Sequence, residues 1–212
     1  MSAEQIPVGR VAGYVMAGGA SRRFGSDKAL AILGGRTMLA RVHALVAQAT
    51  GGAIVVTPPG RYTDHILETI PDRWPDEGPL GGIITALRHT SEAFRESEWN
   101  LIVSCDMPFL SGDWLSHLRQ RSADSAAEIV VPRSRYGLEP LCACWRTSSV
   151  ESLQLSFDAG TRRVTEAMKL LRAEVLDEPH WKRFDTAGRL FWNMNTPEDY
   201  KEAARIEKME NA

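Results

Sequence analysis

The sequence has few cysteines, almost no net charge and no long apolar run. Its 212 residues include three cysteines and carry a formal net charge of -2. Three thiols in apolar runs cannot all pair within one chain, so we expect reduced, buried cysteines and a cytoplasmic location. The near-neutral charge gives no reason to expect nucleic acid or a membrane surface as a partner. No apolar run approaches the roughly 20 residues of a membrane helix, and the N-terminus lacks a signal-peptide pattern.

Repeats, linkers and the commonest catalytic signatures are also missing. We find no internal repeat and no low-complexity segment, so we expect a single domain over residues 1–212. The hydrophobic content of 43% and the charged content of 25% favour a packed core over disorder. Neither a P-loop nor a Gly-x-Gly-x-x-Gly fingerprint occurs. The five histidines are scattered, and we assign none of them a role.

Strand and helix patterns alternate along the first half. Buried strands are predicted at 10–17, 51–57 and 99–106, and helices at 38–49, 78–90 and 112–121. Residues 62–70 read as a weak, short helix or a turn. This alternation predicts a mainly parallel sheet with helices on both faces.

The second half adds two successive strands, which break the alternation. They are predicted at 127–132 and 139–146, and a further short strand lies within 172–179. Helices are predicted at 148–157, 161–171 and 195–210, the last with Thr196 as cap and Pro197 in its first turn. We therefore expect a small antiparallel part in an α/β fold.

A glycine-rich loop follows the first strand. Residues 18–28 read Gly-Gly-Ala-Ser-Arg-Arg-Phe-Gly-Ser-Asp-Lys. Consecutive backbone N–H groups in such a turn form an anion-binding nest, and Arg23 and Lys28 add positive charge. We interpret the loop as a phosphate site; the alternative is a strand–helix turn with solvated cations.

Carboxylates and amides mark three other places. Asp106 ends a buried strand, where it is suited to hold Mg²⁺ or, alternatively, to cap the next turn. Asp72, Asp76 and Glu77 precede the Gly78 helix start, and one of these carboxylates could contact a ribose or base; Asp76 and Glu77 also suit charges at the turn and the first helical turn. Asn193 and Asn195 could bind a metal or a phosphate, or simply stabilise the turn before the last helix.

These segments together resemble the nucleotidyltransferase family that builds the molybdenum cofactor, and its guanylyltransferases in particular. The family opening Leu-Ala-Gly-Gly-x-Ser-x-Arg-Met-Gly-x-Asp-Lys matches residues 16–28, with two apolar replacements. The family motifs Gly-Pro-Leu-Ala-Gly, Cys-Asp-Met/Thr-Pro and Asn-x-Asn-Thr-Pro-Glu-Asp match 78–82, 105–108 and 193–199. The resemblance covers about 8–207, but Thr57 stands where the family often has Asn.

The resemblance implies a three-layer, Rossmann-like fold and a role for each matched residue. It implies transfer of GMP from GTP to molybdopterin, with Mg²⁺ as cofactor and molybdoenzymes or their chaperones as recipients of the product. Lys28, Arg23 and Asp106 would be catalytic, with Asp106 as metal ligand, and Asn193 and Asn195 would bind molybdopterin. The implied nucleotide-binding residues are Met16, Ala17, Gly18, Gly19, Lys28, Asp72, Gly78 and Asp106.

Other functions stay open at this point. The same fold could serve a CTP-dependent cytidylyltransferase acting on the same pterin, or an enzyme that acts on a sugar phosphate. Relatives that use CTP tend to have Ala where this chain has Gly18, and to lack the segment at 78–82, so both features favour guanine. A GTP-binding module without catalysis is the non-enzymatic alternative.

Overall fold

The computed structural model describes residues 11–18, 24, 27–62 and 67–210. Its strands form one large sheet and a small hairpin. The large sheet has the order β10–β7–β9–β6–β1–β4–β5, with β8 paired to β7. These strands are β1 (Val11–Met16), β4 (Ile54–Thr57), β5 (Thr69–Pro71), β6 (Trp99–Ser104), β7 (Ile129–Ser134), β8 (Gly137–Leu138), β9 (Cys142–Arg146) and β10 (Ala173–Leu176). The hairpin pairs β2 (Ile32–Leu33) with β3 (Arg36–Thr37).

The sheet is mainly parallel, and β9 is the antiparallel strand within its main path. β1 pairs in parallel with β4 and β6, and β5 extends this run beyond β4. β9 runs opposite to both of its neighbours, β6 and β7. Because two reversals restore the direction, β7 and β10 point the same way as β6. The carboxyl ends of β1, β6, β7 and β10 therefore lie at one edge of the sheet.

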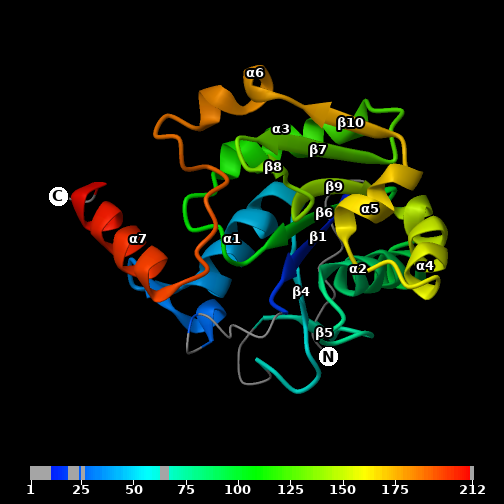
Figure 1. The fold of residues 1–212 in the computed structure, drawn as a ribbon, viewed down its shortest axis with the longest axis horizontal. Coiled ribbons are helices and arrows are strands. Elements are labelled where there is room, and N and C mark those ends of the chain that lie inside the picture. Colours follow the sequence, from blue (N-terminus) through cyan, green and yellow to red (C-terminus); the bar gives the residue numbers. More distant parts are fainter. Residues whose placement is uncertain (1–10, 19–23, 25–26, 63–66, 211–212) are drawn as a thin grey trace.

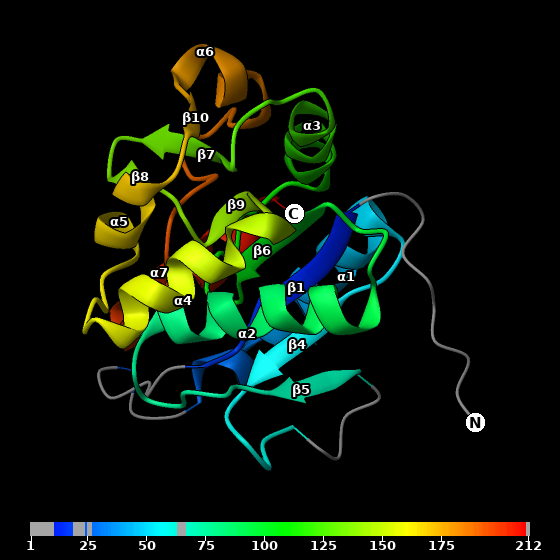
Figure 2. The ribbon, with the colours of Figure 1, turned by 90° about the vertical axis from the view of Figure 1, so that its right-hand side faces the viewer.

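Helices cover both faces of the sheet, which confirms the three-layer α/β prediction (Figures 1 and 2). One apolar core includes Val42 of α1 and Leu115 of α3; the opposite core includes Ile83 of α2 and Leu153 of α4. The helices are α1 (Met38–Thr50), α2 (Pro79–Ala93), α3 (Gly112–Ala123), α4 (Val150–Asp158), α5 (Val164–Ala167), α6 (Glu178–Trp181) and α7 (Pro197–Glu210). Among the residues described, no helix has the length and apolar character needed to cross a membrane.

Local sequence explains where the main helices begin. The Thr37 hydroxyl accepts a hydrogen bond from the Ala40 N–H at 3.2 Å and so caps α1. At α7, Thr196 and Asp199 exchange backbone and side-chain hydrogen bonds of 2.8 and 3.1 Å, as a capping box does. Gly78, in the left-handed region at φ 92°, precedes Pro79 at the start of α2.

The weak helix or turn predicted at 62–70 is wrong at residues 69 and 70, and residues 63–66 lie outside the described residues. Residues 69–71 form the edge strand β5, whose partners are Val55, Val56 and Thr57 of β4. The segment has no strand-like alternation of apolar and polar residues. It becomes a strand through main-chain pairing with β4, which its own sequence does not reveal. The β2–β3 hairpin and the short helix α6 were also not predicted.

Candidate functional site

Three segments that are distant in sequence meet at the carboxyl edge of the sheet. Asp106 follows β6 and is 9% exposed. Its Oδ2 accepts a hydrogen bond from the Lys28 Nζ at 2.6 Å, and the same ammonium lies 3.2 Å from the Asn195 Oδ1. The Met194 N–H donates to the Asp106 carbonyl at 2.8 Å, which fixes the segment before α7 beside the carboxylate. The structure thus brings Lys28, Asp106 and Asn195 into one cluster.

Asp27 fixes the turn that carries Lys28. Its Oδ1 accepts from the Ala29 N–H at 3.1 Å, and its Oδ2 accepts from Arg61 and from the Tyr62 hydroxyl, both at 2.8 Å. Burial, with the Asp27 hydrogen bond as the next cause, raises the pKa of Tyr62 well above its ordinary value. The hydroxyl therefore stays a donor. Sequence reasoning assigned Asp27 no role, although the residue lies inside the matched opening motif.

A pocket of about 360 Å³ lies beside this cluster. Met16, Gly18, Asp72 and Gly78, four of the predicted nucleotide-binding residues, line it together with Ser104 of β6. The amino end of the 15-residue helix α2 opens onto it, and this end of a helix carries a partial positive charge. We call this cavity the donor pocket.

Asp72 is held rigidly at the wall of the donor pocket. Its Oδ1 accepts from the Trp74 N–H at 3.0 Å and from the Thr85 hydroxyl at 3.1 Å, and its own N–H donates to the Thr57 carbonyl at 2.7 Å. The other oxygen, Oδ2, lies 3.6 Å from the position that a Cβ on Gly82 would take. Asp72 can therefore offer Oδ2 to a ligand without losing these three bonds.

Asp106 keeps one carboxylate oxygen without a hydrogen bond. Its Oδ1 is buried and has no partner among the described residues. Such an atom is costly unless something binds it, and a divalent cation is a fitting partner for a carboxylate oxygen. No group of three or more His, Cys, Asp or Glu side chains suited to a metal occurs in the described part of the chain. The residues present therefore fit a metal that takes most of its ligands from substrate and water.

Glu139 is a second buried carboxylate near this edge of the sheet. It is 7% exposed, and its Oε1 accepts from the Ser134 hydroxyl at 2.5 Å. Burial raises the pKa of Glu139; the Ser134 hydrogen bond opposes this shift, and the charge of Asp106 adds to it. No sequence pattern points to Glu139, because its neighbourhood depends on how β7, β8 and β9 pair.

The remaining predicted site residues lie in different surroundings. Gly19 and Arg23 fall outside the described residues. Ala17 is buried, and its N–H donates to the Val56 carbonyl at 2.9 Å. The Asn193 side chain donates to the Phe191 carbonyl at 3.2 Å, whereas Asn195 contacts Lys28.

Neither the cysteines nor Arg162 supplies reactive chemistry here. All three cysteines are free and buried, and burial raises the pKa of each thiol to about 12, so none is a ready nucleophile. Arg162 forms an ion pair of 2.6 Å with Glu77 and packs over the Phe157 ring. Its guanidinium thus links α4 with the loop before α2.

Comparison with known proteins identifies a family and similar proteins for this chain. Residues 13–174 match the family model of the MobA-like NTP transferase domain. A molybdenum cofactor guanylyltransferase of Desulfosudis oleivorans is 31% identical over 195 residues, which is 91% of this chain and 94% of the relative. A probable molybdenum cofactor guanylyltransferase of Deinococcus radiodurans is 35% identical over 190 residues, covering 89% and 91% of the two chains.

Solved structures show the same fold. The crystal structure of molybdopterin-guanine dinucleotide biosynthesis protein A from Archaeoglobus fulgidus superimposes with a TM-score of 0.77. The alignment covers 93% of this chain and 98% of the other, at 24% sequence identity. The arrangement of the sheet and its helices is therefore shared.

Proposed function

The chain belongs to the MobA-like NTP transferase domain family, and we propose that it is a molybdenum cofactor guanylyltransferase. In this proposal it transfers GMP from GTP to the terminal phosphate of molybdopterin and releases pyrophosphate. The observation that carries the proposal is the Lys28–Asp106–Asn195 cluster beside the donor pocket. A nucleotide whose base lies in the pocket can place its phosphates at that cluster.

The residues divide into two tasks. The donor pocket holds guanine and ribose, with Gly18 against the base and Asp72 accepting a hydrogen bond from the nucleoside. The Lys28 ammonium neutralises phosphate charge, and Asn195 keeps it near Asp106. Arg23, which lies outside the described residues, is proposed to add a second positive charge.

Asp106 is proposed to hold Mg²⁺ through the oxygen that lacks a partner. A bound Mg²⁺ neutralises the negative charge that develops on the transferring phosphoryl group. The protein positions the acceptor phosphate in line with the α-phosphorus. An acceptor phosphate oxygen forms the new bond to that phosphorus. The bond to the oxygen that bridges to the β-phosphate breaks, and its electrons leave with pyrophosphate. Because the acceptor is already an anion, no strong base is needed.

We propose that the product passes to molybdoenzymes or their chaperones, because a modified cofactor must reach an enzyme that uses it. We also propose a single domain over residues 1–212 and a cytoplasmic location, the latter because the three cysteines are free thiols.

The test is pyrophosphate release with molybdopterin and Mg²⁺, run in parallel with GTP, CTP and UTP. We expect turnover with GTP and a fall of at least a hundredfold in Asp106→Asn, since metal stabilisation is worth several kcal/mol and about 1.4 kcal/mol is tenfold in rate. Asp113→Asn, which changes an exposed acid in the first turn of α3, is the matched control. Preference for CTP would indicate a cytidylyltransferase, and GTP binding without turnover would indicate a binding module.

A further inference from the structure

A group transfer needs a second pocket for the acceptor, and the donor pocket is filled by the nucleotide. Besides the donor pocket, the described residues enclose cavities of about 630 and 500 Å³. The smaller of these two is lined by Val11 and Trp99, the first residues of β1 and β6. It therefore lies at the amino edge of the sheet, on the wrong side for a reaction at Asp106.

The larger cavity lies at the carboxyl edge. Arg133 and Ser134 end β7, and Asp177 follows β10; all three line it. The turn between β7 and β8 and the segment around α6 form its walls, and Figures 1 and 2 both show α6 close to these strands. Its size falls in the usual range of small-molecule sites, about 300–1,000 Å³.

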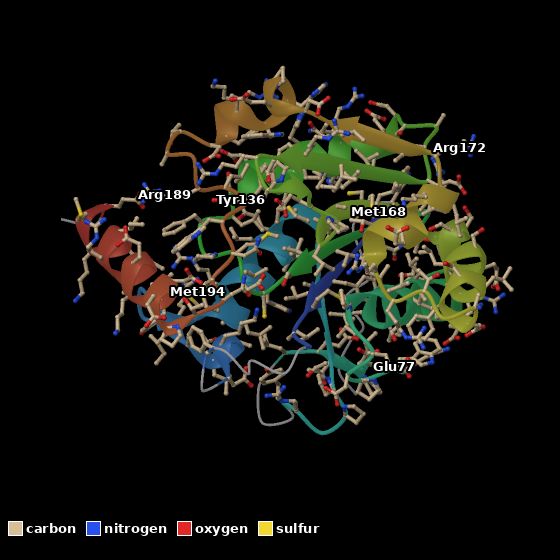
Figure 3. All side chains as sticks on the ribbon, in the orientation of Figure 1. Glu77, Tyr136, Met168, Arg172, Arg189 and Met194 are labelled. Carbon is tan, nitrogen blue, oxygen red and sulfur yellow. The ribbon has the colours of Figure 1, made fainter. Side chains whose placement is uncertain are left out.

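Two links connect this cavity to the reacting groups. Phe191 lines the cavity, and three residues later the Met194 N–H bonds to the Asp106 carbonyl. A chain spans at most about 3.5 Å per residue, so the Cα atoms of Phe191 and Met194 lie within about 11 Å of each other. In Figure 3, Met194 lies next to α7, whereas Tyr136 lies above it and nearer the middle of the view.

The second link runs through the buried acid. Ser134 lines the cavity and donates to Glu139. The Ser104 N–H donates to the Leu141 carbonyl at 2.8 Å, so the segments that carry Asp106 and Glu139 run side by side. The Ser134–Glu139 pair thus connects the cavity with the segment beside Asp106. A ligand that reaches around this pair has one end in the cavity and the other at Lys28 and Asp106.

The walls of the cavity suit a flat, nitrogen-rich ring system. The Trp181 indole is held in place, because its Nε1 donates to the Arg133 carbonyl at 3.0 Å and its ring meets Phe191 edge-on at 5.2 Å. The Tyr136 ring also lines the cavity and is 56% exposed. Its hydroxyl accepts a hydrogen bond from Arg135 at 2.6 Å, and the Arg135 guanidinium lies over one face of the ring, 4.8 Å from its centroid. Aromatic faces of this kind stack on heteroaromatic rings.

The cavity also offers polar partners for the edge of such a ring. Asp177 supplies carboxylate oxygens and Arg133 supplies guanidinium donors, and their 3.6 Å separation leaves both groups able to reorient. The fused ring of a pterin carries an amino group, ring N–H groups and a carbonyl along its edge, which need acceptors and donors side by side.

We propose that the cavity between the β7–β8 turn and α6 binds the pterin end of the acceptor, with Tyr136 stacking on the ring. This inference rests on the proposed function, and it extends the acceptor site beyond Asn193 and Asn195. The phosphate arm of the acceptor runs along residues 191–195 to Lys28 and Asp106. Tyr136 is a specificity residue for the acceptor and has no part in binding the nucleotide.

The test measures steady-state kinetics with molybdopterin and GTP varied separately. Tyr136→Ala is expected to raise the KM for molybdopterin about tenfold, equivalent to about 1.4 kcal/mol, and to leave the KM for GTP unchanged. Tyr136→Phe keeps the ring and should restore the KM to within about twofold of the wild type. Leu170→Ala, at an exposed apolar side chain that does not line the cavity, is the matched control.

A binding measurement separates this inference from the proposed function. The probe is a fluorescent pterin with a phosphomethyl arm, titrated into the intact protein without GTP. Binding that weakens in Tyr136→Ala but not in Leu170→Ala supports the pocket even if turnover is absent. An unchanged KM and unchanged probe binding in Tyr136→Ala would overturn the pocket while leaving guanylyl transfer intact. A wild type that binds the probe but transfers nothing to molybdopterin would overturn the function alone.

Discussion

Replacing Gly18 by alanine tests whether the donor pocket selects guanine over cytosine. A Cβ built on Gly18 has the Pro58 Cδ, at 3.9 Å, as its nearest neighbour, which is ordinary van der Waals contact. The φ of Gly18 lies outside the left-handed region, so the backbone does not require glycine. The free protein should therefore accept the methyl group. Its stability should change by less than about 1 kcal/mol, with a gain as the expected sign.

The cost should appear when a nucleotide binds. Gly18 forms part of a pocket of about 360 Å³, and a methyl group there takes space next to the base. A small steric change of this kind is worth roughly 1–3 kcal/mol, which corresponds to roughly 5- to 150-fold in kcat/KM. Guanine is larger than cytosine, so the loss should be greater with GTP. The segment at 78–82, which also favours guanine, is unchanged in this variant. The preference for GTP over CTP should therefore weaken without reversing.

The assay compares kcat/KM for GTP and CTP in the wild type and in Gly18→Ala, together with thermal unfolding. Gly13→Ala is a useful contrast, because its Cβ would lie 2.3 Å from the Thr50 Oγ1 and 2.6 Å from the Gly52 carbonyl. That variant should lose stability and keep its nucleotide preference. An equal fall for both nucleotides in Gly18→Ala would refute the base-contact reasoning, and a wild type that prefers CTP would refute the guanine assignment.

Three further variants probe the surroundings of the reacting groups. Lys28→Ala should weaken GTP about tenfold and GMP much less, because the lost charge faces the outer phosphates; calorimetry with both nucleotides checks this, and equal weakening would contradict it. Tyr62→Phe removes one of two donors to the Asp27 Oδ2. It should cost about 1 kcal/mol of stability and lower kcat/KM several-fold, and unchanged kinetics would show that the Asp27 contact does not position Lys28. Glu139→Gln removes a carboxylate whose folded pKa is raised above its ordinary value of 4.5. Such a group lowers the unfolding free energy as pH rises from 4.5 towards the folded pKa, so the variant should lose that decline, measured by denaturant titration from pH 4 to 8. A wild-type profile in the variant would place the titration elsewhere.

Local signals in the sequence predicted most of the elements correctly. Thr196 caps a helix as expected, and Thr37 caps another, since a hydroxyl and the N–H three residues later are close neighbours in any chain that turns there. The apolar runs at β1 and β6 predict buried parallel strands, because only a central strand can bury both of its faces. Asp106 is predicted at the carboxyl edge for the same reason. Sequence similarity then supplies the family, which composition and spacing alone do not.

The tertiary structure decided everything that depends on which strands become neighbours. Thr69–Pro71 is a strand only because β4 has a free edge to pair with. Asn195 meets Lys28 across 167 positions, and Glu139 approaches Asp106 because β9 runs antiparallel between β6 and β7. The cavity at α6 forms where β7 and β10 end together. Helix capping and the burial pattern of a strand depend on a few neighbouring residues and can be predicted from the sequence. The order and direction of strands follow from packing the whole chain. Lys28, Asp106 and Asn195 can therefore be picked out from the sequence, but the place where they meet and the cavity at α6 cannot.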